Sequence, residues 1–382
     1  MVVLGANIDW QLIRRDFPVT EHTAYLNSAA AGALPRIVME TAADFYREMM
    51  EAGDAGWDGW LARREEIRRR VAEFINAEPD EIAFTTNTSA GMNLIADALE
   101  GRGDVISCEL EFPVSIVPWL HRGAHVNSIK AREGEISAED VARAQTSKTS
   151  VIALSHVQYS NGFRLDLESI GAIKKSHAFV VNASQSIGAF PIDVKRMKID
   201  ALCATGHKWL LAGYGCGFVY MSRKLLAQTR GRNASWMSVE QPFAMRNDEF
   251  KTRTDAAARA ELGVPHFAGI FALGAALDYL MKIGKEKIER RVLYLNRHLT
   301  GCLAERKWPV LSPLRNEHAR SGQTLIATEN PARVVANLAC CGVMVTEKPQ
   351  GIRVATHFFN DEADIGRLIA ALYDSAMVQT ST

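Results

Sequence analysis

The middle of the chain alternates short apolar runs, rich in β-branched and aromatic residues, with amphipathic stretches. Polar or glycine-bearing residues follow each apolar run, and the runs are Ile82–Thr85, Val105–Cys108, Val151–Leu154, Phe179–Val181 and Ala201–Ala204. Apolar runs of this length are typical of strands buried on both faces, as in a parallel sheet covered by helices. We therefore predict an α/β fold in which the carboxyl ends of the strands carry the functional residues.

Before this region, apolar residues recur at mostly helical spacing from Leu61 to Ile75. The arginines of that helix, Arg63-Arg64 and Arg68–Arg70, are expected on its solvated face, because Glu65 and Glu66 interrupt them.

A smaller unit follows the predicted sheet. A helical pattern runs with few breaks from about Phe271 to Cys302. Candidate strands and a last helix come after it, at Thr324–Ala327, Val343–Val345, Ile352–Val354 and Asp361–Ala376. This order is typical of an α+β domain. We expect a large domain over residues 21–268, a small one over residues 269–382, and packing of residues 1–20 against the small domain.

Length and composition agree with two domains and argue against several classes of function. The chain has 382 residues, of which 47% are hydrophobic. Its 44 basic and 44 acidic side chains cancel, so no long-range field attracts nucleic acid or an anionic membrane. Six cysteines without a CxxC spacing argue against a disulfide framework and a zinc site, and Cys108 and Cys203 are expected in the core. Since no apolar run is long enough for a membrane span and no signal-like segment opens the chain, we expect a cytoplasmic protein.

A lysine follows the last of these predicted strands, in Thr205-Gly206-His207-Lys208-Trp209. There it lies on the floor of the crevice where open α/β sheets bind ligands. A desolvated lysine loses its proton more easily, and its free amine condenses with aldehydes. Alone, such a lysine is usually a surface charge; its neighbours favour a functional role.

Two neighbouring segments are suited to a phosphorylated cofactor. The strand Ile82–Thr85 runs into Thr86-Asn87-Thr88-Ser89 and a predicted helix from Ala90 to Leu99. Hydroxyls and free N–H groups at a helix N-terminus form an anion site, although without Lys208 an ordinary N-cap at Thr88 or Ser89 would be the simpler interpretation.

Polar side chains also follow the strand Phe179–Val181. Asn182 is placed to face the ring nitrogen of a cofactor, and Gln185 is placed to reach its phenolic oxygen, unless both are simply turn residues. Arg353 lies inside an apolar strand pattern, where an unpaired guanidinium is costly. A substrate carboxylate or a structural ion pair would resolve that cost.

Together these residues resemble the class V aminotransferase family, a group of pyridoxal-phosphate enzymes of fold type I that includes cysteine desulfurases, selenocysteine lyases and isopenicillin N epimerase. The resemblance covers nearly the whole chain, through Tyr25–Ala30, Thr86–Asn93, Glu111–Trp119, Ser155–Val157 with Gly162, Asn182–Gln185, Thr205–Lys208, Gly351–Val354 and Phe359–Asp361. It implies a mostly parallel seven-stranded sheet sandwiched by helices, a smaller α+β C-terminal domain, pyridoxal 5′-phosphate as cofactor, and a homodimer with the active site at the interface.

The resemblance also implies roles for single residues. Lys208 would form the Schiff base with the cofactor and then move the α-proton of the substrate. The phosphate would be held by Thr88, Ser89, Thr205 and His207. Phe112 would stack on the cofactor ring where desulfurases have a histidine, Gln185 would contact the cofactor oxygen, and Arg353 would bind the substrate carboxylate. Asn27 and Tyr159 are expected to line the side-chain pocket of the substrate.

Three departures from the family pattern bear on the reaction. Asn182 stands where the family normally has an aspartate, so the ring would be a weaker electron sink. The segment Thr346–Gln350 lacks the nucleophilic cysteine of the desulfurases, and Cys340 and Cys341 lie too early to replace it. Val264 replaces a threonine that supplies a phosphate contact from the partner subunit.

These departures lead to the expected function. We predict an enzyme that transforms a small amino acid by β-elimination, of the C–S lyase type, or by epimerisation, rather than by persulfide-forming desulfuration. The alternatives are an aminotransferase and a cofactor-binding scaffold with weakened catalysis. Whether Arg259 binds a second carboxylate or pairs with Glu261 or another acid stays open. Partners other than the amino acid and a second copy of the chain, such as nucleic acid, membrane or metal, are not expected.

Overall fold

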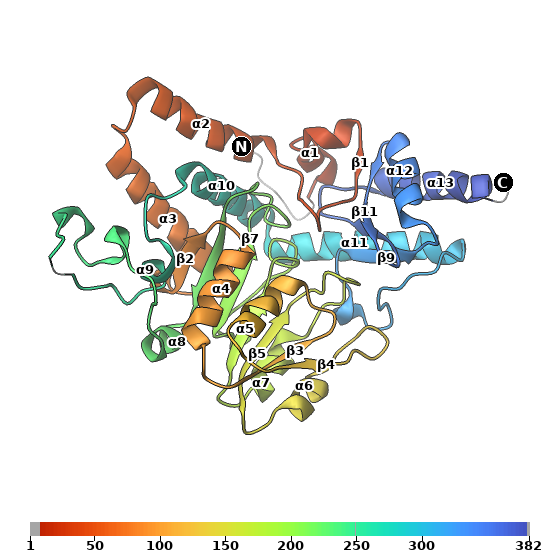
Figure 1. The fold of residues 1–382 in the computed structure, drawn as a ribbon. Coiled ribbons are helices and arrows are strands. Elements are labelled where there is room, and N and C mark those ends of the chain that lie inside the picture. Colours follow the sequence, from red (N-terminus) through yellow and green to blue (C-terminus); the bar gives the residue numbers. More distant parts are fainter. Residues whose placement is uncertain (1–7, 249, 380–382) are drawn as a thin grey trace.

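The computed structural model describes residues 8–248 and 250–379, so the first seven residues of the predicted N-terminal segment and the last three of the predicted small domain lie outside the described residues. Its centre is a seven-stranded sheet in the order β2-β8-β7-β6-β5-β3-β4 (Figure 1). The strands are β2 (Ile82–Thr85), β3 (Asp104–Cys108), β4 (Val126–Ile129), β5 (Thr149–Ser155), β6 (Ala178–Asn182), β7 (Ala201–Thr205) and β8 (Gly217–Met221).

The sheet is mostly parallel, as predicted. Only β8 runs antiparallel, to both β2 and β7. All five strands predicted for this sheet are present, whereas β4 and β8 were not predicted. The pattern of β4 is half polar because this strand lies at the edge, whereas β8 is an apolar run that follows directly on a glycine-rich stretch.

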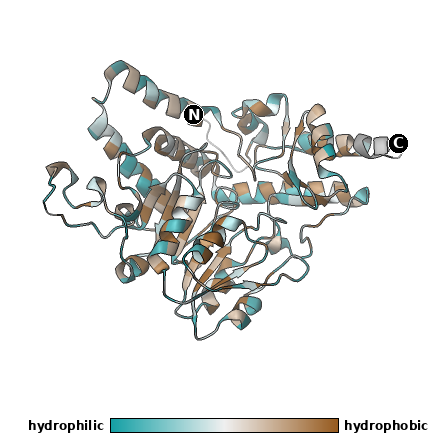
Figure 2. Cartoon of the chain, in the orientation of Figure 1, coloured by the Kyte–Doolittle hydropathy of each residue, from teal (hydrophilic) through white to brown (hydrophobic). Residues whose placement is uncertain are grey.

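Helices cover both faces of the sheet because successive strand residues point to opposite sides. Val180 packs into one core with α4 (Thr88–Leu99), whereas Phe179 and Val181 pack into the other core with α3 (Trp57–Ile75). The apolar colouring of the strands in Figure 2 follows from this double burial. The remaining helices around the sheet are α2 (Arg36–Ala52), α5 (Val117–His121), α6 (Ala138–Ala144), α7 (Leu167–Ile173), α8 (Arg223–Gln228), α9 (Ala257–Ala260) and α10 (Phe267–Ile283).

A second, smaller core lies beside the first. Its elements are α11 (Lys285–Glu305), β9 (Gln323–Ala327), α12 (Pro331–Cys340), β10 (Val343–Met344), β11 (Thr346–Lys348), β12 (Gly351–Ala355) and α13 (Glu362–Gln379). The N-terminal strand β1 (Ala24–Tyr25) pairs with β10, and the antiparallel sheet has the order β11-β12-β9. Near the N-terminus, α1 (Trp10–Arg14) is tied to α13 by the ion pair of Arg14 with Asp364.

The long helical pattern predicted from Phe271 to Cys302 is two helices rather than one. Gly284 separates α10 from α11, and its φ of 99° is a conformation that glycine adopts readily. The two helix axes are bent by 80° at this break. Among the described residues, no single helix is long and apolar enough to cross a membrane. Only α10 and α11 taken together, as this bent pair, have the required length and composition.

The arginines of α3 differ from the prediction. Arg69 is exposed, but Arg64 and Arg68 are buried. The Arg68 guanidinium donates to both carboxylate oxygens of Glu261, and that carboxylate also accepts the backbone N–H of Phe84 in β2 at 2.8 Å. The helix therefore uses these cations to fix the edge strand, because the partner carboxylate comes from a segment that the local pattern does not reveal.

Replacement of Arg68 by alanine is expected to lower the free energy of unfolding by about 3 kcal/mol, because it leaves the buried Glu261 carboxylate with only the longer contact to Arg64, at 3.8 Å. The matched control on the same helix is Arg70→Ala, whose ion pairs are more exposed and are expected to contribute at most about 1 kcal/mol. Urea unfolding curves of the two variants measure the difference. Equal losses would contradict this account of Arg68.

Candidate active site

The carboxyl ends of the central strands meet at one edge of the sheet. Strand register places Thr85 and Thr205 opposite the same residue of β8, Gly217, and it places Asn182 beside both Ser155 and Cys203. The predicted site residues that follow β2, β6 and β7 are thereby brought together, as expected for an open α/β sheet.

Lys208 is a partly buried amine that lacks a partner. Among the described residues, none forms a hydrogen bond or an ion pair with its Nζ. Burial lowers the pKa of Lys208 to about 8, and the positive charges of Arg353 and Lys348 contribute further. About a tenth of the amine is therefore unprotonated at pH 7, far more than for a lysine with the usual pKa of about 10.4, and nucleophilic attack on an aldehyde requires this form.

A glycine holds the loop over the lysine. The Gly32 N–H donates to the carbonyl oxygen of His207 at 2.8 Å, and a Cβ at Gly32 would lie 2.0 Å from the carbonyl oxygen of Lys208. Only a residue without a side chain allows this approach. The segment that carries Asn27 and Ala29 is thus brought against the lysine loop.

His207 is held in a fixed orientation next to Lys208. Its Nδ1 lies 2.7 Å from Oγ1 of Thr205, and its ring stacks on Tyr214 with the centroids 4.6 Å apart. Burial, and then the charge of Lys208, lower the pKa of His207 to about 4, so the imidazole is neutral at pH 7. A neutral ring can approach a phosphate as a hydrogen-bonding group without adding charge to the site.

The predicted anion site at the start of α4 has a different cap from either expectation. The N-cap is Asn87, whose Oδ1 accepts from the N–H of Ala90 at 2.9 Å. The helix therefore begins at Thr88, not at Ala90, and Thr88 and Ser89 are its first two helical residues. Their N–H groups have no intrahelical acceptor, which suits an anion. The Thr88 hydroxyl is buried 2.6 Å from that of Ser184, whereas Ser89 is exposed.

Asn182 is oriented by hydrogen bonds on both sides of its amide. Its Oδ1 accepts from the N–H of Ser184 at 3.0 Å, and its Nδ2 donates to Oγ of Ser115 at 3.1 Å. Ser115 in turn bonds to the carboxyl of Glu111. Burial raises the pKa of Glu111, and the carboxyl is bonded by Ser155 and Gln158.

Gln185 is largely engaged by the protein itself. Its Nε2 donates to the carbonyl oxygen of Ala29 at 2.9 Å, and its Oε1 accepts from the indole N–H of Trp209 at the same distance. One Nε2 hydrogen is left for a ligand. The side chain also connects the lysine loop to the segment around Ala29.

Arg353 lies in β12 without an ion pair. No carboxylate of the described residues is within ion-pair distance, and Nε of this buried guanidinium has no hydrogen-bond partner. Its Nη2 lies 3.4 Å from Oγ1 of Thr346, which is bonded to Asn27. Burial lowers the pKa of Arg353 to about 10, and Tyr159 opposes that shift. The sequence left two ways to compensate the buried guanidinium charge, a structural ion pair or a substrate carboxylate. The described residues provide no such ion pair, so the substrate carboxylate remains the prediction.

An aromatic wall stands beside Arg353. The rings of Phe112 and Tyr159 meet edge to face with centroids 5.0 Å apart, and Phe112 is 46% exposed. Nζ of Lys348 lies 4.4 Å from the centroid of Tyr159. Lys348, Glu111 and Ser115 also belong to this region, although the sequence pattern placed them only within the longer stretches Thr346–Gln350 and Glu111–Trp119 and indicated no role for any of them. The only local signals were a lysine in a short hairpin and an acid directly before Phe112.

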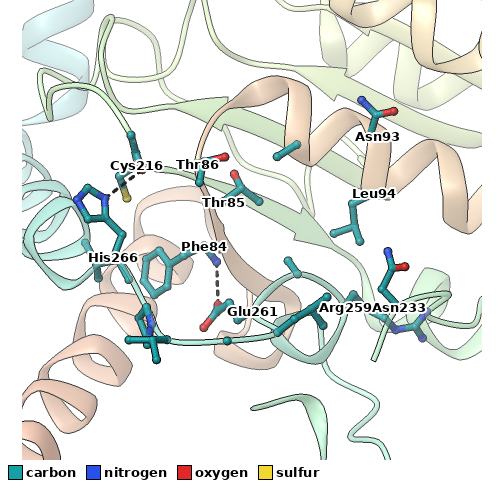
Figure 3. A pocket seen from close by; sticks show the side chains of 18 of the residues that line it. Phe84, Thr85, Thr86, Asn93, Leu94, Cys216, Asn233, Arg259, Glu261 and His266 are labelled. Atoms are coloured by element: carbon teal, nitrogen blue, oxygen red, sulfur yellow. Dashed lines mark hydrogen bonds between the residues drawn. The ribbon is translucent and has the colours of Figure 1, made fainter. Parts of the chain in front are cut away.

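A separate cavity of about 370 Å³ lies between α4 and the segment around Glu261 (Figure 3). Lys208 and Arg353 do not line it. Val264 lines it and is 67% exposed.

Arg259 forms no ion pair with Glu261, contrary to one of the two expectations; it donates to the carbonyl oxygens of Leu226 and Thr229.

Comparisons with known proteins agree on one family. A family model described as Aminotransferase class-V matches residues 24–368. A probable cysteine desulfurase of Pyrococcus abyssi is 30% identical over 81% of this chain and 80% of its own length. The uncharacterized aminotransferase YcbU of Bacillus subtilis is 26% identical over 93% of this chain and 95% of its own.

Solved structures show the same fold. The apo structure of a cysteine desulfurase from Thermococcus onnurineus superposes with a TM-score of 0.88 at 24% identity and covers 97% of this chain and 99% of that one. A complex of a cystine C–S lyase with cysteine persulfide gives 0.86 at 22% identity, over 94% and 99%. The predicted fold type is confirmed.

The depressed pKa of Lys208 predicts a pH dependence for its reaction with aldehydes. Because the folded protein holds this pKa near 8 instead of 10.5, the reactive free amine should rise with pH through a midpoint near 8. Brief reductive methylation of the cofactor-free protein with formaldehyde, followed by peptide mass spectrometry, measures the rate at Lys208. A midpoint near 10.4, typical of a free lysine, would contradict the desolvation of this amine.

Proposed function

Because the chain belongs to the class V aminotransferase family and is a pyridoxal-phosphate-dependent enzyme, we propose that Lys208 carries the cofactor and that the enzyme transforms a small amino acid. One observation carries this proposal: the same site contains the amine of Lys208 and the guanidinium of Arg353, and neither has an ion-pair partner among the described residues. Each group lacks the partner that a bound cofactor and a substrate carboxylate would supply.

The residues present fit the cofactor. The N-terminus of α4 and the hydroxyl of Thr88 would hold the phosphate with Thr205 and His207, and Phe112 would cover one face of the ring. When bound, pyridoxal phosphate supplies an aldehyde for the lysine amine and an electron-accepting ring for the electrons released at the α-carbon of the substrate.

The substrate would be held and deprotonated by two side chains. Arg353 would bind the α-carboxylate in bidentate fashion and so fix the position of the α-carbon. Lys208 would receive the α-proton on Nζ. A pKa near 8 suits this role, because the amine is both available as a base and able to return the proton near neutral pH.

Asn182 weakens electron withdrawal at the ring nitrogen. A neutral amide supplies no negative charge there, and the bonds to Ser184 and Ser115 fix its orientation. Reactions that need less delocalisation, such as β-elimination and epimerisation, are therefore favoured over transamination.

Persulfide formation would need a nucleophilic cysteine close to Arg353. The segment between β11 and β12 is only Pro349-Gln350, a tight turn. Cys340 and Cys341 are exposed at the end of α12, outside this hairpin. These features support elimination of the C–S lyase type or epimerisation, although relatives of the chain are named cysteine desulfurases.

We further propose a homodimer. Exposed apolar side chains lie on α2, which extends away from the sheet in Figure 1, and three of them, Met39, Tyr46 and Met50, share one face at helical spacing. Apolar surface of this kind marks a protein interface. In such a dimer, Val264 would lie where the family's threonine contacts the cofactor phosphate of the partner subunit. Valine has no hydroxyl for this contact, so another group would have to supply it.

Lys208→Ala should abolish the borohydride-reducible absorption band that wild-type protein shows with pyridoxal phosphate, and should lower kcat by at least about 10³-fold because the base is gone. Visible spectra before and after borohydride, and turnover assays, measure both effects. The control is Lys282→Ala, an exposed lysine of α10. Identical spectra of wild type and Lys208→Ala would leave the scaffold alternative, whereas rapid conversion of the band to the pyridoxamine form would favour the aminotransferase.

The double variant C340A/C341A should keep at least half of wild-type activity towards cysteine derivatives, because neither thiol lies in the hairpin that carries Arg353. Pyruvate, ammonia and a thiol are the expected products of elimination, and recovery of the opposite enantiomer is expected for epimerisation. Chromatography of the products measures this. Production of alanine and enzyme-bound persulfide that is lost in the double variant would establish desulfuration instead.

A further inference from the structure

We propose that Lys348 binds a second anionic group of the substrate, so that the enzyme acts on amino acids whose side chain carries a small anion such as a carboxylate or sulfinate. This inference rests on the proposed function, because it takes Arg353 as the ligand of the α-carboxylate. It goes further by assigning the side-chain end of the substrate.

The hairpin register places Lys348 and Arg353 on the same face. Strands β11 and β12 are antiparallel, with Thr346 opposite Arg353 and Lys348 opposite Gly351. Side chains two residues apart on a strand share a face, and directly opposed residues share it as well. Lys348 therefore projects beside Arg353, whereas Glu347 points to the other face and is exposed.

The aromatic wall limits where the Lys348 amine lies. Its Nζ is 4.4 Å from the ring centroid of Tyr159, and that ring contacts Phe112 edge to face. A cation over an aromatic ring gains about 0.5–2 kcal/mol, but the ring does not neutralise the charge. The amine is thus held at the wall of the site and still lacks a counter-ion.

Three cations in this region, Lys208, Lys348 and Arg353, have no carboxylate as an ion-pair partner among the described residues. Burial, and then the charge of Arg353, lower the pKa of Lys348 to about 8. Like charges gathered in a partly desolvated site are unfavourable, and an anionic ligand relieves that cost.

The number of anions needed can be counted. The α-carboxylate of an amino acid neutralises Arg353, and the phosphate of the cofactor is assigned to the N-terminus of α4. Lys208 reacts with the aldehyde as the neutral amine, so it needs no counter-ion for that reaction. Lys348 remains, next to the side-chain end of a substrate held by Arg353, and Gly351 opposite it adds no side chain that would fill the space.

Calorimetric titration of the cofactor-loaded enzyme with succinate and with butyrate tests the assignment without turnover. The two probes have the same chain length but carry two carboxylates and one. Wild type should bind succinate at least about tenfold more tightly than butyrate, which corresponds to about 1.4 kcal/mol. Lys348→Met and Lys348→Gln should bind both equally, Lys348→Arg should keep the preference, and the exposed control Lys282→Met should match wild type.

The contrary outcomes are distinct. Equal binding of the two probes by wild type that shows the full cofactor band would overturn this inference and leave the proposed function intact. A weaker affinity for the cofactor in both neutral variants, with the preference for succinate unchanged, would assign Lys348 to the cofactor phosphate and likewise overturn it. Absence of the cofactor band in wild type would overturn the proposed function itself.

Discussion

The desolvated amine of Lys208 is the constraint on which the site depends. A pKa lowered from 10.5 to about 8 corresponds to a cost on the order of 3 kcal/mol for the charged amine. Surrounding structure must offset such a cost, and here it does so through well-packed neighbours. The backbone of Gly32 lies in close contact with the lysine loop. Trp209 is buried, and its indole N–H donates a hydrogen bond to Gln185. The neighbouring residues limit the contact of this amine with water, and none of the described residues gives it a counter-ion.

Charge in the rest of the site follows from the same arrangement. Arg353 and Lys348 lower the pKa of Lys208 further, and neither has an acidic partner among the described residues. Elsewhere in the molecule the buried cation Arg68 is paired, with Glu261. The two buried cations differ in their partners: Arg68 ties a helix to the edge strand through Glu261, whereas Arg353 has no carboxylate partner among the described residues, which is why we propose it as the ligand of the substrate carboxylate. Asn182 is neutral, and the carboxyl of Glu111 is connected to it only through Ser115.

The fold was predictable from local pattern to a large extent. The five apolar runs became β2, β3, β5, β6 and β7 with ends within two residues of those expected, because buried strands need apolar side chains on both faces. The strand β4 was missed because an edge strand needs fewer of them. The solvated face assigned to α3 was wrong at Arg64 and Arg68, since their partner Glu261 lies in a distant part of the chain. The start of α4 was also displaced, because Asn87 and not Thr88 or Ser89 is its cap.

The sequence by itself determined the kind of sheet, the place of Lys208 after a buried strand, and the polar residues that follow the neighbouring strands. These features are written in contiguous residues, so periodicity and residue type suffice to find them. Only the tertiary structure decided which charges are paired. The register between β11 and β12 brings Lys348 beside Arg353, and strand packing connects Glu111 to Asn182 through Ser115. Burial and partnership are properties of residues that meet in space, and no local pattern specifies them.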